Sequence, residues 1–209
     1  MFLDRLSAPD RDTFLSFRTP FDIQTYLDSL PYVGEDLNRT PLRVMQDRQC
    51  HCLDGGLLGA LALSHLGFAP LILDLVPAPG VDDDHVLALF RLSSGWGAVA
   101  KSNFPGLRFR EPIYRSLREL VMTYFEVFFN EHGQKTLRGY TRPLDLRRYD
   151  HCEWQTTQTG VDRVTAALYA RRCIPVLDAQ AVSALNPMDA RAFEANMLGV
   201  NRDGLYKPH

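Results

Sequence analysis

The stretch from Leu57 to Leu66 constrains the fold most, because it is apolar on nearly every side. A helix without a polar face lies inside a core and not at a surface, so the sequence predicts that other elements enclose it. The chain has 209 residues, 45% hydrophobic and 23% charged, which is enough to build such a core within one domain. We therefore expect a single domain over residues 1–209 and exclude a disordered chain and a fibrous repeat.

Other helices are predicted where apolar residues recur at helical spacing. They are Phe21–Leu30, Pro112 to about Glu131, Val161–Cys173 and Met188–Leu198. Pro112 is assigned to the first turn of its helix, where proline is favoured. Pro70–Val76 is predicted to be a strand, with three leucines on one face and Asp74 on the other.

Two further β-type runs, His85–Leu92 and Trp96–Asn103, are separated by three residues that end in Gly95. A three-residue loop with glycine in the left-handed position predicts a hairpin. If the residues on either side of this loop face each other, counting back along both strands places His85 directly opposite Asn103.

Charge and hydropathy exclude several classes of partner. Twenty-three Lys and Arg against 25 Asp and Glu give a net charge of −2, so we expect no nucleic-acid partner. The longest apolar-rich run, Leu57–Leu75, is interrupted by polar residues and prolines, so we expect no membrane span. The stretch Met1–Leu15 lacks the apolar segment of a signal peptide, and the four cysteines are too few for a disulfide scaffold. We expect a cytoplasmic protein with free thiols.

Three residues have the chemistry of a cysteine-dependent acyl transfer site. A cysteine at the first turn of a buried helix has its pKa lowered by the helix dipole, which makes Cys52 the candidate nucleophile. An imidazole must take up and return the proton, and His85 is the candidate. A third group must orient the ring, and Asn103 is placed to do so by the hairpin. Asp54 partly opposes the effect of the dipole.

The order of these residues resembles a known superfamily. The motifs that carry the resemblance are Cys52-Leu53-Asp54-Gly55-Gly56 before an apolar helix, Asp83-Asp84-His85-Val86, and Gly95-Trp96 before a strand. They are similar to the transglutaminase-like superfamily, whose cysteine-protease-like core is shared with arylamine N-acetyltransferases. The segments Trp96–Asn103, Leu107–Pro112 and Arg118–Leu120 resemble a bacterial branch of it.

The resemblance implies an α+β fold in which a helix carries the Cys and packs on a small antiparallel sheet. It covers roughly residues 20–150, which leaves 151–209 as a helical C-terminal extension. It implies a helix-borne Cys at Cys52, a strand-borne His at His85 and a third residue at Asn103. The usual third residue of the superfamily is an Asp on the next strand, and Trp96–Asn103 contains none.

Four further residues are candidates for the oxyanion site or for substrate binding. Gln46 lies six residues before Cys52, the spacing of a side-chain oxyanion donor in papain-like proteases. Lys101, Arg108 and Arg110 form a basic stretch suited to a carboxylate, a phosphate or a carrier's phosphopantetheine arm. Alternatively, the arginines pair with nearby glutamates on a solvated face.

Metal sites are weaker interpretations of the same sequence. Asp82, Asp83 and Asp84 have ligands that calcium prefers, but a solvated acidic turn is the simpler interpretation. The spacing of Cys50 and Cys52 is poor for a tetrahedral zinc site. We expect neither a metal nor an organic cofactor.

The sequence thus predicts an enzyme that hydrolyses an amide or thioester, or transfers its acyl group to an amine, through Cys52, His85 and Asn103. The acyl donor is a small molecule, a peptide or a carrier-bound group. The alternative is a degenerate transglutaminase-like domain that serves as a binding or scaffold module, because the usual Asp is missing.

Overall fold

The computed structural model describes residues 2–35, 37–93 and 95–206. Its helices are α1 (Ala8–Ser16), α2 (Pro20–Ser29), α3 (Pro41–Asp47), α4 (Cys52–His65), α5 (Leu117–Met122), α6 (Gln158–Tyr169), α7 (Ala179–Ser183) and α8 (Ala190–Asn196). Its strands are β1 (Leu71–Pro77), β2 (His85–Leu92), β3 (Gly95–Val99), β4 (Arg110–Tyr114), β5 (Leu137–Thr141), β6 (Leu144–Asp145) and β7 (Cys173–Pro175). Short 3₁₀ turns join several of them.

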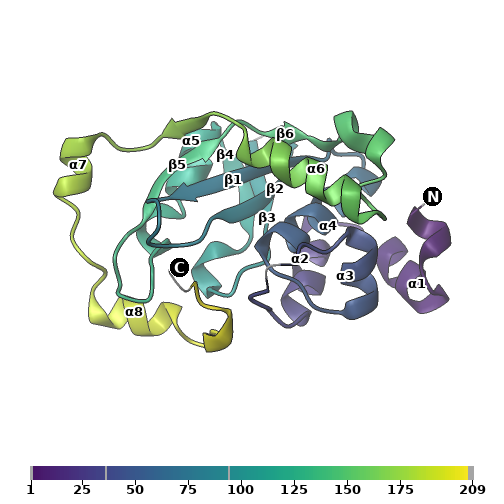
Figure 1. Ribbon diagram of the computed structural model, residues 1–209, viewed down its shortest axis with the longest axis horizontal. Coiled ribbons are helices and arrows are strands. Elements are labelled where there is room, and N and C mark those ends of the chain that lie inside the picture. Colours follow the sequence, from purple (N-terminus) through teal and green to yellow (C-terminus); the bar gives the residue numbers. More distant parts are fainter. Residues whose placement is uncertain (1, 36, 94, 207–209) are drawn as a thin grey trace.

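All of these strands belong to one antiparallel sheet in the order β4-β3-β2-β1-β5-β7, with β6 also paired to β1. The α+β class is therefore confirmed. Figure 1 shows α2, α3 and α4 grouped beside the sheet, and the chain after α6 passing through α7 and α8 before it returns to the middle of the molecule. The extension 151–209 is not only helical, since β7 completes one edge of the sheet.

Each face of the sheet has its own core. One core joins the apolar sides of α1 to α4 and α6 to residues of β1 and β2 such as Ile72 and Val86. The other joins the alternate strand residues, including Leu73 and Leu87, to α5 and the turns that flank it. The predicted strand and its two faces are thus confirmed, with Asp74 on the α4 side.

Helix α4 is enclosed as its apolar sequence predicts, and it begins at Cys52. Three glycines allow it to approach the sheet closely. A Cβ atom on Gly55 would lie 2.3 Å from Lys101 Cβ, one on Gly56 would lie 2.7 Å from Val86 Cγ1, and one on Gly59 would lie 3.1 Å from Ala88 Cβ. This packing fixes the N-terminus of α4 beside the start of β2.

The hairpin is confirmed, but its predicted register was wrong by one residue. Leu92 pairs with Gly95 and Ala88 with Val99, so Gly95 belongs to β3 and not to the loop. Ser94, which the predicted loop included, lies outside the described residues. β3 thus begins one residue earlier than predicted, and hairpins prefer such short connections. By this register His85 would face Ser102 and not Asn103, but β3 already ends at Val99.

The predicted helix from Pro112 to Glu131 was also wrong. Pro112 lies in β4, an edge strand, where its missing N–H interrupts no central ladder. The helix starts later because the Ser116 hydroxyl accepts the Glu119 N–H as an N-cap. Most apolar residues of this segment, among them Leu120 and Tyr124, are nevertheless buried.

The three other predicted helices are present with somewhat different bounds. α2 matches Phe21–Leu30 closely, α6 replaces Val161–Cys173, and α8 covers only the centre of Met188–Leu198. Among the described residues, no helix is both long and apolar enough to cross a membrane.

The close packing of α4 leads to a stability prediction. Gly55→Ala should lower the free energy of unfolding by about 1–3 kcal/mol, because its methyl group would overlap the side chain of Lys101. Gly59→Ala in the same helix is the matched control, since its methyl meets only a tight contact and gains helix propensity of about 1 kcal/mol. Urea unfolding of both variants measures the difference, and equal stabilities would contradict the packing argument.

Candidate functional site

Cys52 is the first residue of α4 and is only 7% exposed. Its thiol lies 3.7 Å from the main-chain oxygen of Asp84, to which it donates. Burial raises the pKa of Cys52 well above its ordinary value, and the carboxyl groups of Asp84 and Asp83 raise it further. In this conformation the thiol therefore stays protonated at neutral pH.

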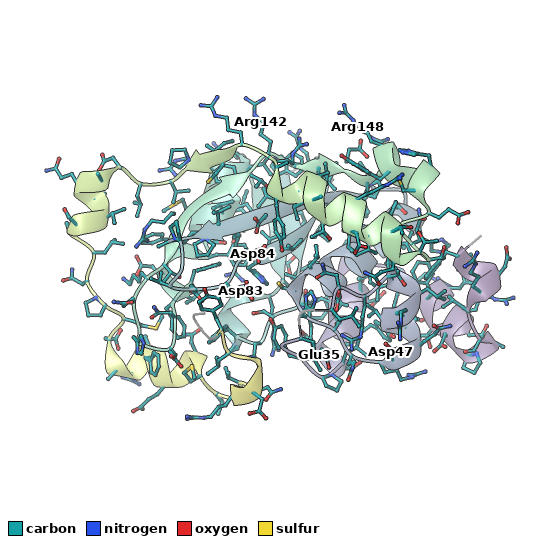
Figure 2. The ribbon with its side chains drawn as sticks, in the orientation of Figure 1. Glu35, Asp47, Asp83, Asp84, Arg142 and Arg148 are labelled. Atoms are coloured by element: carbon teal, nitrogen blue, oxygen red, sulfur yellow. The ribbon has the colours of Figure 1, made fainter. Side chains whose placement is uncertain are left out.

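A cluster of ion pairs around buried Arg39 and Asp54 anchors the start of α4. Asp54, in the first turn, accepts hydrogen bonds from the main-chain N–H groups of Arg39 (2.6 Å) and His51 (3.3 Å). The Arg39 guanidinium lies 3.8 Å from Asp54 and also pairs with Glu35 and Asp47. Figure 2 labels Glu35 and Asp47 below the N-terminal helices, and Asp83 and Asp84 nearer the middle of the molecule. Asp54 thus fixes the position of Cys52, a role that the sequence alone did not indicate.

His85 is the first residue of β2, and its ring belongs to the sheet face opposite α4. Its Nε2 lies 2.7 Å from the Leu107 carbonyl, and its ring centroid lies 6.5 Å from that of Tyr124. Because a carbonyl oxygen only accepts, Nε2 carries the proton of the neutral ring and Nδ1 is left as the basic nitrogen. Burial lowers the pKa of His85 to about 4.

Cys52 and His85 line two adjacent pockets. The His85 pocket also includes Asn103, and the Cys52 pocket includes His51. The pockets share the walls formed by Tyr32, Asp83, Asp84 and residues 204–206. Within the described part of the chain, no hydrogen bond joins the Cys52 thiol to the His85 ring. The structure therefore places the two side chains around one region without bringing them into contact.

Asn103 does not orient His85. Its amide donates from Nδ2 to the Asn201 carbonyl and accepts the Asn201 N–H at Oδ1, both over 2.8 Å. The prediction that Asn103 orients the His85 ring was wrong because it depended on the hairpin register. The group that accepts the hydrogen bond of His85 Nε2 is the Leu107 carbonyl instead. A main-chain acceptor of this kind leaves no side-chain signal in the sequence.

The other candidates are placed as follows. Gln46 is exposed on α3. The Lys101 ammonium donates to the Leu27 and Leu30 carbonyls at the end of α2, and Arg108 pairs with Asp28 at 3.6 Å. Arg110 donates to Thr123 and stacks 4.0 Å over the Tyr124 ring. The three basic residues therefore make contacts within the fold, and none of these four residues lines either of the two pockets.

The acidic turn is less solvated than the sequence indicates. Asp83 is exposed, but Asp82 is hydrogen-bonded to Thr136, and Asp84 interacts with buried Asp74 of β1. Burial raises the pKa of both Asp74 and Asp82 to about 6. Two adjacent carboxyl groups beside Cys52 favour sharing one proton over carrying two charges. Sequence reasoning missed Asp74 because one carboxylate on a strand carries no motif.

Among the described residues, no three His, Cys, Asp or Glu side chains gather as ligands for a metal ion. All four cysteines, including Cys50 and Cys52, are free thiols, as expected.

The low pKa of His85 predicts a pH-dependent stability. Between pH 6.5 and 4, His85 is protonated in the unfolded chain but stays neutral in the folded chain. The free energy of unfolding therefore decreases progressively as the pH falls. The free energy of unfolding of the wild type should therefore drop relative to His85→Gln by up to about 3 kcal/mol over that range. Asp74 and Asp82 act in the opposite direction in both proteins, and their effect cancels in the difference. Urea titrations at several pH values measure it, and a constant difference would show that the ring is solvated.

Comparison with known proteins does not assign this chain to a family. No protein-family model matches this chain, and no curated protein matches it either.

Proposed function

We propose that this chain is a cysteine-dependent acyl-group enzyme in which Cys52 is the nucleophile and His85 is the proton shuttle. One observation carries the proposal. A thiol at the N-terminus of a buried helix lines a pocket that adjoins the pocket of a buried imidazole, and the Nε2 of that imidazole is held by a carbonyl. This leaves Nδ1 as the proton acceptor, and the thiol as the group to be deprotonated.

The reaction follows from these roles. The Cys52 sulfur attacks the carbonyl carbon of an amide or thioester, and its proton passes to Nδ1 of His85. The tetrahedral oxyanion accepts a hydrogen bond from the main-chain N–H of Cys52. This N–H lies in the first turn of α4, where N–H groups have no hydrogen-bond partner within the helix. When the tetrahedral intermediate collapses, the amine or thiol leaves and takes up the proton from His85. Water or an amine then attacks the acyl carbon while Nδ1 of His85 takes up its proton, the carbon–sulfur bond breaks, and the Cys52 thiolate recovers that proton.

The Leu107 carbonyl orients the His85 ring, as an Asp or Asn side chain orients the histidine ring in known cysteine-dependent enzymes. Its carbonyl fixes the ring and its tautomer but adds no full negative charge to stabilise an imidazolium. Thiol and ring are both uncharged in this conformation, since burial raises one pKa and lowers the other. The chemistry therefore requires the two side chains to approach each other in a more hydrated site.

A second function is favoured by a different observation. The amide of Asn103 binds both main-chain groups of one residue, which is a binding contact and not a catalytic one. A module that has kept the fold and binds a polypeptide, without any reaction at Cys52, also accounts for this contact.

Acylation of Cys52 distinguishes the two functions. Incubation with p-nitrophenyl acetate should place one acetyl group on Cys52, located by peptide mass spectrometry, and His85→Ala should slow this step on the order of 100-fold because it removes the base. Exposed Cys173 is the internal reference, since its acetylation should not respond to His85. Equal rates at Cys52 in the wild type and in His85→Ala would refute the enzyme and favour the binding module.

A further inference from the structure

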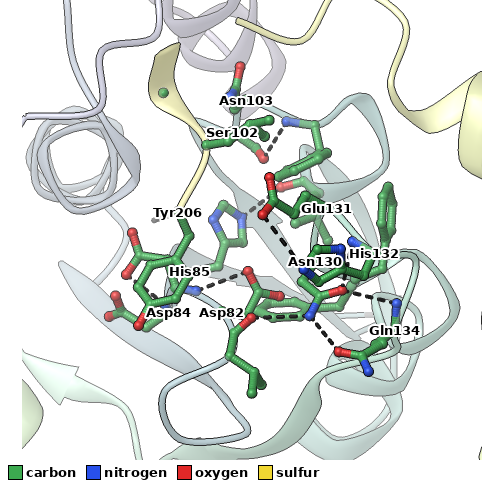
Figure 3. A pocket seen from close by; sticks show the side chains of 18 of the residues that line it. Asp82, Asp84, His85, Ser102, Asn103, Asn130, Glu131, His132, Gln134 and Tyr206 are labelled. Atoms are coloured by element: carbon green, nitrogen blue, oxygen red, sulfur yellow. Dashed lines mark hydrogen bonds and ion pairs between the residues drawn. The ribbon is translucent and has the colours of Figure 1, made fainter. Parts of the chain in front are cut away.

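The C-terminal segment, Asn201–Tyr206, lies between the Cys52 pocket and the His85 pocket. Gly204, Leu205 and Tyr206 line both pockets. Figure 3 shows the Tyr206 side chain in the His85 pocket, near those of Asp84 and His85. A segment of the chain itself thus forms part of the wall between the pockets of the two candidate reacting groups.

The segment is held mainly through its backbone. Asn103, only 6% exposed, binds the N–H and the C=O of Asn201 at 2.8 Å each. A primary amide has one donor side and one acceptor side, so it matches the two main-chain groups of a single extended residue. Such a contact does not depend on the side chain of the residue that is bound.

The residues after Asn201 pass close to Tyr32 and Gly34. A Cβ atom on Gly34 would lie 2.6 Å from Gly204 Cα, and one on Gly204 would lie 3.0 Å from the Tyr32 ring. The Asn201 side chain adds a hydrogen bond of 3.0 Å to the Tyr32 carbonyl. Tyr32, Gly34 and Asn103 therefore form a passage for a polypeptide chain without a bulky side chain at the position of Gly204.

The part of the chain that carries the segment is weakly attached. Neither α7 nor α8 has a fully buried residue, and Leu198 is 80% exposed. The main aromatic contact of α8 is between Phe193 and Phe129, with centroids 5.4 Å apart. The segment can therefore leave the pockets without disturbing the two cores.

Asn201 has extended backbone, and Arg202–Gly204 after it form a 3₁₀ turn. We infer that this passage binds a polypeptide as the acyl substrate, that Asn103 binds its main chain at one extended residue before such a turn, and that residues 201–206 occupy the place of this substrate in the resting chain. The inference rests on the proposed function and narrows its substrate to peptides and proteins. Departure of the segment would join the two pockets and admit water. Hydration would reverse the burial that holds Cys52 and His85 uncharged.

Two substitutions of Asn201 test the occupancy. Asn201→Pro removes the N–H that Asn103 accepts, and the φ of −73° at this residue suits proline. Asn201→Ala keeps both main-chain contacts and is the matched control. Loss of the hydrogen bond from the Asn201 N–H to Asn103 should speed iodoacetamide alkylation of Cys52 on the order of tenfold in the proline variant. The alkylation rate of the alanine variant should stay close to that of the wild type. Cys173 again serves as the internal reference.

Hydrogen exchange of the full wild-type chain gives an independent measure. The Asn201 amide should exchange slowly, and Asn103→Ala should remove that protection while the protection of α4 is retained. Alkylation that is equal in all Asn201 variants, together with an unprotected Asn201 amide, would overturn the occupancy.

The substrate class is tested by direct binding. A labelled peptide with the sequence of residues 198–206 should bind the full-length Asn201→Pro chain at least about tenfold more tightly than it binds the wild type, whose own segment competes. Adding Asn103→Ala to the proline variant should abolish the gain, and a peptide with proline in place of Asn201 should bind about tenfold more weakly. Equal binding by all these proteins would refute the passage as a peptide site.

The outcomes separate this inference from the proposed function. If acetylation of Cys52 does not depend on His85 while the peptide still binds through Asn103, the enzyme fails and the peptide site stands. If acetylation depends on His85 but Asn201→Pro changes neither alkylation nor peptide binding, the enzyme stands and the inference fails.

Discussion

The contact between α4 and the sheet determines where everything else in the site can lie. Because Gly55, Gly56 and Gly59 present no side chain, the helix rests almost directly on β2 and on the residues after β3. The thiol of Cys52 then reaches the main chain just before His85. Asp54 and its bond to the Arg39 backbone fix the same end of the helix from the other side. Larger side chains on this face would move Cys52 away from the strand.

Much of the fold follows from patterns within the sequence. The apolar run after Cys52 predicted an enclosed helix, and alternation in β1 predicted its two faces, because burial depends on the periodicity of a single element. The site depends instead on relations between elements. A shift of one residue in the β2–β3 register removed Asn103 from His85, and the acceptor that replaced it is the carbonyl of Leu107. Pro112 illustrates the same limit, since only its place at the sheet edge distinguishes strand from helix.

The site combines desolvation with a shortage of positive charge. Cys52, Asp74 and Asp84 are all acids on one face, and each is buried enough to retain its proton more strongly than in water. Lys101, which would favour a thiolate, is directed instead to the end of α2. Electrostatics in this conformation therefore opposes the ion pair on which thiol chemistry usually depends.

The C-terminal segment belongs to the same molecule as the passage that it fills, so its local concentration is fixed by the tether and not by the solution. For short flexible linkers such an effective concentration is roughly millimolar. A free polypeptide that competes for the passage faces that concentration at every encounter. In the proposed peptide-binding role, polypeptides would then be discriminated by this internal competition, and weakly binding or scarce ones would be excluded from the passage.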